Sequence, residues 1–202
     1  MRLRQRRCAL LLPLAVLAMA ATGCQTTVEP APTQQSDWFD GGPMQPATAE
    51  TLQLTARVLA AKGRMEQAGF VLDRMYAQYP EFLGTYTEGA EVLLLQGRVK
   101  DATGWLDRGL QRFPAQPILL NNRGLCHLLA ADLSAATADF EAAYAADPGD
   151  ADFVANLALA RALAGNDMEA ARLWNTVLPP EAVGENLTIT KQARPRFKAP
   201  KP

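Results

Sequence analysis

Three prolines recur along this chain at one fixed interval. Pro80 ends the run AQYP, Pro114 ends QRFP and Pro148 ends AADP, so each stands 34 residues from the next. Proline ends a helix because it lacks the backbone donor and its ring clashes with the preceding turn. A fixed period of this length is the sign of stacked supersecondary units, and it predicts a repeat protein.

Placing each proline at the same point of its unit starts the repeats at Ala49, Leu83 and Pro117, with a fourth at Ala151. Two columns of the alignment hold only small residues, which helices need where they approach closely. A third column holds large apolar residues at the helical spacing expected of a core face. The small columns are Ala56, Ala90, Gly124 and Ala158, and Ala68, Ala102, Ala136 and Ala170; the large column is Leu72, Leu106, Phe140 and Trp174.

Glycine marks the end of the first helix in three of the four units, at Gly63, Gly97 and Gly165, whereas the third unit reads LAADLSAA and lacks it. Glycine supplies the left-handed conformation that a helix stop favours. Two helices per 34-residue unit resemble the tetratricopeptide repeat, or TPR. This resemblance implies an all-α, right-handed α-solenoid of about three and a half to four helix-turn-helix repeats.

The fourth unit departs from the pattern because its second helix soon meets Pro179-Pro180. We therefore expect a truncated helix there, a short solvating cap over 181–193, and disorder over 194–202. The predicted domain organisation is a signal peptide at 1–23, a lipidated cysteine and flexible tether at 24–46, a TPR domain at 47–182, and a capping segment with a basic disordered tail at 183–202.

The N-terminus has the layout of a secretory signal, with MRLRQRR followed by the apolar run ALLLPLAVLAMA. The next residues, AATGC, resemble the lipobox of bacterial lipoproteins, which implies cleavage before Cys24 and a diacylglycerol on its thiol. Ala21 stands where that family usually has leucine, so an ordinary signal cut near Ala21, leaving a free Cys24, is the alternative. In the same family an aspartate after the cysteine often retains the protein on the inner membrane, so Gln25 implies the outer membrane.

After the proposed cleavage Cys24 would carry lipid, and Cys126 would be the remaining cysteine, so no intramolecular disulfide is expected. Cys126 is predicted to be a small buried apolar residue. The segment 25–46 has the composition of a linker. Within it, the pair Trp38-Phe39 has two interpretations, a hydrophobic clip onto the first helix or a docking motif for a partner.

Charge and motif content argue against several functions. Residues 25–190 carry 11 basic and 21 acidic residues, and such an acidic body repels phosphates, which argues against nucleic acid as a partner. The chain has no phosphate loop, no G-x-S-x-G, no CxxC and no HExxH, and it has one histidine. We expect no catalytic residue, no metal and no cofactor other than the lipid on Cys24.

In TPR proteins the first helix of each repeat lines the concave face, so the resemblance assigns a partner-binding groove there. Several of these positions are apolar, which suits an extended apolar segment or an amphipathic helix. For Leu94 and Leu128 the alternative is that they belong to the core between repeats. The predicted groove residues are Gln53, Arg57, Thr87, Glu91, Leu94, Asn121, Leu125, Leu128, Asp152 and Leu159.

Lipobox, short tether and about four repeats together resemble the TadD type of lipoprotein in the tight-adherence (Flp) pilus system. The segment Pro117–Trp174 and the ending VLPPEAVGENL carry most of this resemblance. It implies a lipid-anchored protein on the periplasmic face of the outer membrane that binds a secretin or pilus component. The alternative is a general periplasmic scaffold that recruits cell-wall or outer-membrane assembly proteins.

Overall fold

The computed structural model describes residues 46–198, which belong to one compact unit, Gln45–Pro202. The proposed signal peptide, Cys24 and Trp38-Phe39 lie outside the described residues. Within the described part every regular element is a helix, and there is no strand. Its helices are α1 (Ala49–Ala61), α2 (Met65–Gln78), α3 (Leu83–Leu95), α4 (Val99–Arg112), α5 (Pro117–Leu129), α6 (Leu133–Ala146), α7 (Ala151–Ala164), α8 (Asp167–Trp174), α9 (Pro180–Ala193) and α10 (Pro195–Lys198).

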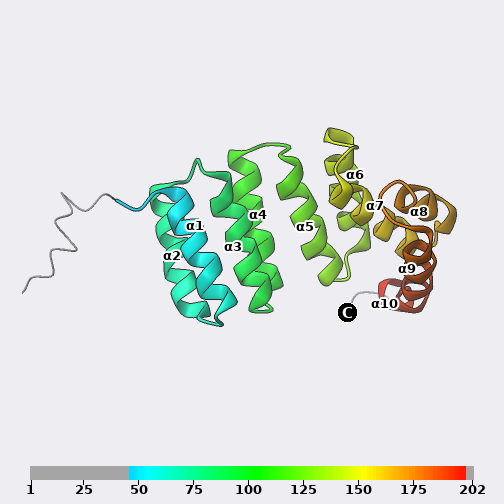
Figure 1. Ribbon diagram of the computed structural model, residues 1–202, viewed down its shortest axis with the longest axis horizontal. Helices are drawn as coiled ribbons and strands as arrows, with labels where there is room; N and C mark the ends of the chain where they lie inside the picture. The colour runs from blue at the N-terminus through cyan, green and yellow to red at the C-terminus, as the bar shows by residue number, and fades with distance from the viewer. Residues whose placement is uncertain (1–45, 199–202) are drawn as a thin grey trace, which may run out of the picture. The chain divides into compact units, whose positions relative to one another are not determined.

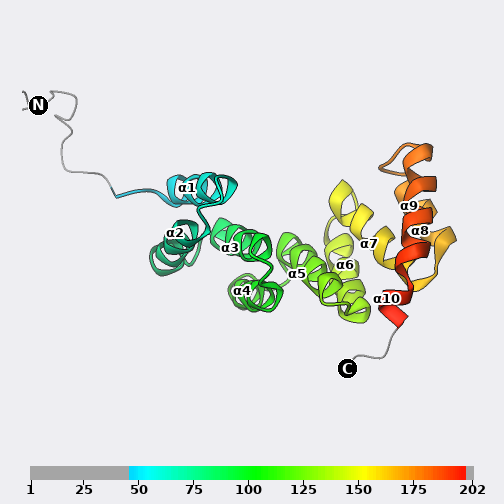
Figure 2. The ribbon, with the colours of Figure 1, turned by 90° about the horizontal axis from the view of Figure 1, so that it is seen from below.

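The helices form successive hairpins, α1 with α2, α3 with α4, α5 with α6 and α7 with α8, which follow one another in Figure 1. The first helix of each hairpin also packs on the first helix of the next, α1 on α3, α3 on α5 and α5 on α7. Figure 2 shows α1 and α3 on one side of the stack and α2 and α4 on the other. This repeating arrangement confirms the predicted all-α helical solenoid.

The predicted columns form the core. The alanines of the small-residue columns are fully buried, with exposed fractions of 0–1%. At Gly124 a larger residue would collide with Phe140, because an added Cβ would lie 2.6 Å from a carbon of its ring. The large column from Leu72 to Trp174 is buried in every unit. Pro80, Pro114 and Pro148 each stand two residues after a second helix, as predicted. The prolines that end the second helices and the buried columns of the core therefore indicate the same repeat boundaries.

Turns between paired helices also follow the sequence, with one substitution. Gly63, Gly97 and Gly165 have φ values of 71°, 71° and 100°. In the third unit Ala131 takes this place with φ 57°. The turn therefore keeps its geometry although its glycine is absent.

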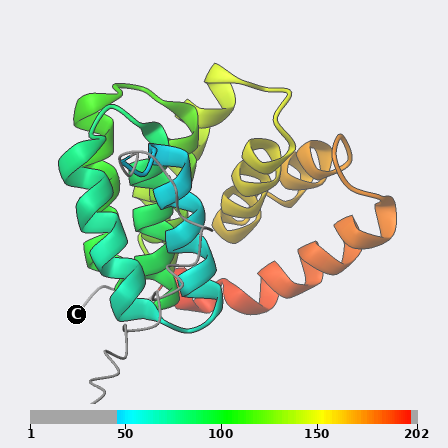
Figure 3. The ribbon, with the colours of Figure 1, turned by 60° about the vertical axis from the view of Figure 1, so that its left-hand side comes forward.

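The C-terminal end differs from the expectation. α8 is short, as Pro179-Pro180 predicts, but α9 is a full helix that contains the predicted boundary between 182 and 183 (Figure 3). It packs on α7 and α8 and buries Val183 and Thr190. The predicted disorder from residue 194 is wrong for the described part of this tail, because α10 follows and Arg194 donates to the carbonyl of Ala162 at 2.8 Å.

Over residues 46–198, no helix combines the length and the apolar character that crossing a bilayer requires.

Candidate functional site

A hollow of about 350 Å³ lies between the first helices α1, α3 and α5. We call it the first-helix groove. Apolar side chains make up part of its wall, and polar groups from all three helices lie among them. Its lining residues are Arg57, Thr87, Glu88, Ala90, Glu91, Leu94, Ile118, Asn122 and Leu125.

Five predicted groove residues meet in this hollow, namely Arg57, Thr87, Glu91, Leu94 and Leu125. They come from three helices because the first helices stack in register, which brings residues about 34 positions apart onto one face. Leu94 also packs against the buried cluster around Leu106, so it contributes to both core and groove.

The other predicted positions lie elsewhere. Asn121 is buried with 5% exposure and accepts a hydrogen bond from Asn156 at 2.8 Å, so its side chain supports the stack instead of facing a ligand. Leu128 and Leu159 pack against the buried cluster around Phe140. Asp152 is exposed in the first turn of α7, outside the hollow.

Glu88 is the functional candidate that sequence reasoning missed. Its side chain is 2% exposed, yet it is a carboxylate. Arg57 donates to it at 2.7 Å and Gln53 donates at 3.3 Å, both from α1. These bonds compensate the buried charge, and the hydrogen bond from Arg57 to Glu88 is the main reason why the pKa of Arg57 is raised.

A periodic signal could have found Glu88. Gln53 and Glu88 are 35 residues apart, and so are Asn121 and Asn156, which bond each other at the corresponding place two repeats later. Between these two pairs lie Thr87 and Asn122, which line the hollow. The side chain of Asn122 forms no hydrogen bond within residues 46–198, so its amide can both donate to and accept from a ligand.

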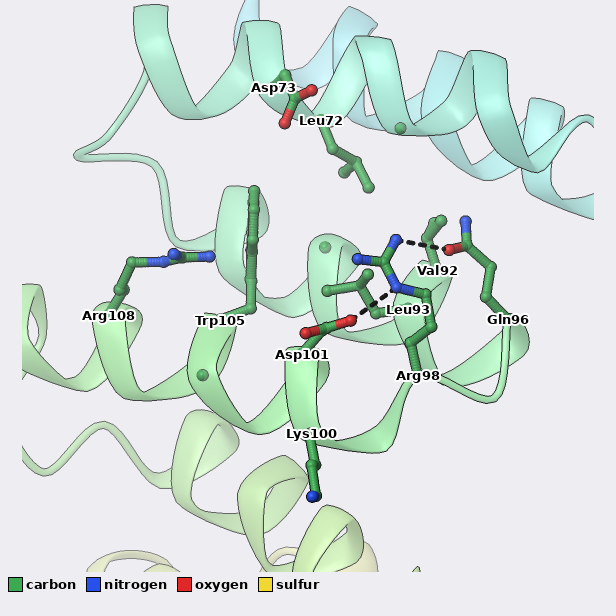
Figure 4. Close-up of a pocket in the computed structure, with 13 residues that line it drawn as sticks. Leu72, Asp73, Val92, Leu93, Gln96, Arg98, Lys100, Asp101, Trp105 and Arg108 are labelled. Carbon is green, nitrogen blue, oxygen red and sulfur yellow. Dashed lines mark hydrogen bonds and ion pairs between the residues drawn. The ribbon is translucent and has the colours of Figure 1, made fainter.

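A second hollow, of about 410 Å³, lies on the other side of the stack between α2, α3 and α4. We call it the second-helix cavity. Leu72, Val92 and Trp105 form apolar walls, and Asp73, Arg98 and Asp101 add charge. Figure 4 shows the ring of Trp105 with Arg108 on one side and the cavity on the other.

Hydrogen bonds, ion pairs and stacking hold three side chains that line the second-helix cavity. Trp105 donates its indole hydrogen to the carbonyl of Thr85 at 3.0 Å, which fixes the ring. The guanidinium of Arg108 stacks 4.8 Å from the Trp105 ring centre. Arg98 is bonded to Asp101 at 2.7 Å and to Gln96 at 3.2 Å, so its charge is already compensated.

Cys126 and His127, two residue types common in catalysis, lie side by side in the sequence of α5. No group of three or more His, Cys, Asp or Glu among the described residues is placed to hold a metal ion. Cys126 is fully buried, as predicted, and burial raises the pKa of its thiol, which opposes formation of the reactive thiolate. His127 faces Asp139 at 3.7 Å and does not pair with this thiol.

Known proteins resemble this chain in fold but not closely in sequence. No protein-family model matches the sequence. No curated protein matches it either.

Several solved structures share the architecture. A thermophilic TPR protein of Thermus thermophilus is 20% identical, with a TM-score of 0.60 over 74% of this chain and 82% of its own. A tetratricopeptide repeat protein of Parabacteroides merdae is 16% identical, with a TM-score of 0.62 over 77% of this chain and 63% of its own. MamA of Desulfovibrio magneticus is 17% identical, with a TM-score of 0.51 over 76% of this chain and 79% of its own. The fold of this chain is therefore of the TPR type.

Proposed function

We propose that this chain is a membrane-anchored scaffold that binds a protein segment in the first-helix groove. The observation that carries this proposal is the hollow between α1, α3 and α5, whose lining combines apolar side chains with the unbonded amide of Asn122. Leu94, Ile118 and Leu125 offer contacts to apolar side chains, while Asn122 and Glu91 can bond a ligand's polar groups. This combination suits an extended apolar segment or one face of an amphipathic helix.

The more specific part of the proposal concerns where the protein lies in the cell envelope and which protein it binds. Cleavage before Cys24 and its lipidation would hold the helical domain at the periplasmic face of the outer membrane through the 24–46 tether. The resemblance to the TadD type then favours a role in assembling a Flp/Tad pilus or its outer-membrane secretin. What supports this is the signal-like N-terminus, the AATGC sequence and the TPR-type fold.

A site-specific cross-linking experiment tests the groove. A photo-reactive residue replaces Ile118, which lines the groove and is 40% exposed, and in a matched control it replaces Met168, which is 90% exposed on α8. Native cell envelopes are irradiated and the adducts identified. We expect a secretin or pilus subunit at position 118 and its absence at 168.

A companion variant, Cys24→Ser, tests the anchor. Loss of the lipid is expected to release the protein from the membrane fraction and to weaken the adduct at position 118. Recovery of cell-wall enzymes or barrel-assembly proteins at 118 instead favours the general periplasmic scaffold. Equal adducts at 118 and 168 contradict binding in the groove.

A further inference from the structure

The three gaps between successive second helices can be compared position by position, because the repeat is 34 residues long. Each gap is bordered by an acidic residue of the earlier second helix. Asp73 of α2, Asp107 of α4 and Glu141 of α6 occupy this same position in consecutive units. What neutralises the acid differs from gap to gap.

In the later gaps an arginine from the intervening first helix bridges the two second helices. Arg123 of α5 donates to Asp107 at 2.8 Å and to Asp139 of α6 at 2.7 Å. Arg161 of α7 likewise pairs with Glu141 and, at 3.3 Å, with Glu169 of α8. In each of these two gaps a guanidinium thus lies between two carboxylates.

The first gap has no such arginine. Gly89 stands where Arg123 stands in the next unit, and Leu93 stands where Arg161 stands two units later. Asp73 forms no hydrogen bond or ion pair within residues 46–198, whereas Asp101 is already paired with Arg98. The space left open is the second-helix cavity.

At one position of the first gap an aromatic ring stands where the next gap has a carboxylate. Trp105 occupies the position of Asp139, and an alanine-sized side chain at Gly89 would already collide with its indole, the added Cβ lying 2.1 Å from Nε1. Arg108 covers one face of Trp105 and the other face borders the cavity (Figure 4). Lys100 points away from the cavity in the same view. An aromatic face and a carboxylate together are a favourable environment for a guanidinium.

We propose that the second-helix cavity receives an arginine side chain of a partner protein, which pairs with Asp73 and stacks on the open face of Trp105. The partner's arginine would pair with a second-helix carboxylate, as Arg123 and Arg161 do in the later gaps. A polypeptide fits better than a free amino acid, because a neighbouring hollow that shares Gly69 and Asp73 with the cavity is lined by Met65 and by Phe70, which is 67% exposed. These apolar side chains offer contacts to residues flanking the arginine.

The probe for this site is Nα-acetyl-arginine N-methylamide, a blocked arginine that mimics the residue within a chain. The full chain is labelled with ¹⁵N, and the indole signals of its three tryptophans, Trp38, Trp105 and Trp174, are followed during titration. We expect a saturable shift of the Trp105 signal with a Kd on the order of millimolar, as suits one side chain. The neutral citrulline analogue is expected to give no saturable shift.

Two variants with matched controls separate binding from general surface effects. Asp73→Asn is expected to raise the Kd measured from the Trp105 signal about fivefold. Asp147→Asn, at an exposed turn, is expected to leave this Kd unchanged. Gly104→Leu adds an apolar side chain at the wall of the cavity, where an added Cβ meets nothing within 4 Å, and is expected to abolish the response. Gly184→Leu is the control, because Gly184 is equally open but lies on α9.

Several results would overturn the proposal. An equal, saturable shift with the citrulline analogue contradicts recognition of a guanidinium. A response that survives both Asp73→Asn and Gly104→Leu places the probe elsewhere. The cavity is lined by α2, α3 and α4 and the groove by α1, α3 and α5, so each site can fail its test while the other stands.

Discussion

At the scale of single residues, Ala131 is held in a conformation that alanine avoids. Its φ of 57° lies in the left-handed region, where the corresponding residues of the other units are glycines. A Cβ there crowds the neighbouring carbonyl, at a cost of about 1–2 kcal/mol. The turn forms anyway because the packed helices α5 and α6 on either side determine its path.

Replacing Ala131 with glycine is expected to raise the free energy of unfolding by about 1 kcal/mol, because glycine adopts this φ without strain. The measurement is equilibrium unfolding in urea. Ala138→Gly on the exposed face of α6 is the control and should lower stability by about 1 kcal/mol. A loss of stability in both variants would contradict the strain at Ala131.

Two helical glycines that border the second-helix cavity should respond in opposite directions to alanine. Gly104→Ala is expected to raise the free energy of unfolding by about 0.5–1 kcal/mol, since α4 gains helix propensity and nothing lies within 4 Å of the new Cβ. Gly89→Ala is expected to lower it by about 1–3 kcal/mol, because Trp105 must move. Thermal unfolding of the two variants side by side checks the sign.

At the scale of elements, arginines of the first helices link successive second helices. Arg123 joins α4 to α6 through three hydrogen bonds, one to Asp107 and two to Asp139, and hydrogen bonding to Asp139 is the main reason why the pKa of Arg123 is raised. The side chain of Asp139 is 9% exposed, so it depends on this cation for compensation. Elements that scarcely touch through their backbones are thus coupled through a charged side chain.

Arg123→Met is therefore expected to lower the free energy of unfolding by about 2–3 kcal/mol, because a largely buried carboxylate loses its partner. Removing the carboxylate as well, in Arg123→Met/Asp139→Leu, should restore most of the loss. Arg98→Met breaks an ion pair whose two side chains are each 55% exposed, and should cost at most about 0.5 kcal/mol. Urea unfolding compares the three, and an equal loss for Arg98→Met and Arg123→Met would argue against the role of burial.

At the scale of the helical domain, α9 closes the C-terminal end of the stack. It packs on α7 as α3 packs on α1, so it takes the place of a first helix in a fifth unit. Val183 joins the buried cluster of Val154, Leu157 and Trp174, which would otherwise lie open to water. A terminal repeat needs such a cover because its apolar face has no further neighbour.

Two substitutions on α9 test this capping role. Val183→Asp buries a charge against the last core cluster and is expected to cause severe loss of stability and aggregation on mild heating. Ile189→Asp lies on the same helix at 55% exposure and should change stability by no more than about 0.5 kcal/mol. Similar melting curves for the two variants would show that α9 does not cap the core.

How much the sequence could predict depended on the range of the interactions involved. The period, the starts of the four first helices and the glycine turns depend on neighbours within one or two helical turns, and the structure confirms them. It also confirms the small-residue columns, which the repeat itself made visible. Five of the ten predicted groove residues meet in the first-helix groove for the same reason, since a repeat in register carries one face from unit to unit.

Side-chain partners were decided by the tertiary structure. Glu88 is buried and Asn121 turns inward because of residues 35 positions away, on the adjacent repeat. Pro179-Pro180 shortened α8 as predicted, but the apolar face left open by that short helix is what holds α9 in place. The second-helix cavity lies where Gly89 stands in place of a bridging arginine, and the packing of three helices shows that this place stays hollow. The sequence by itself thus determined the repeat, because its interactions are local, and the tertiary structure determined which charges are paired and which surfaces stay open.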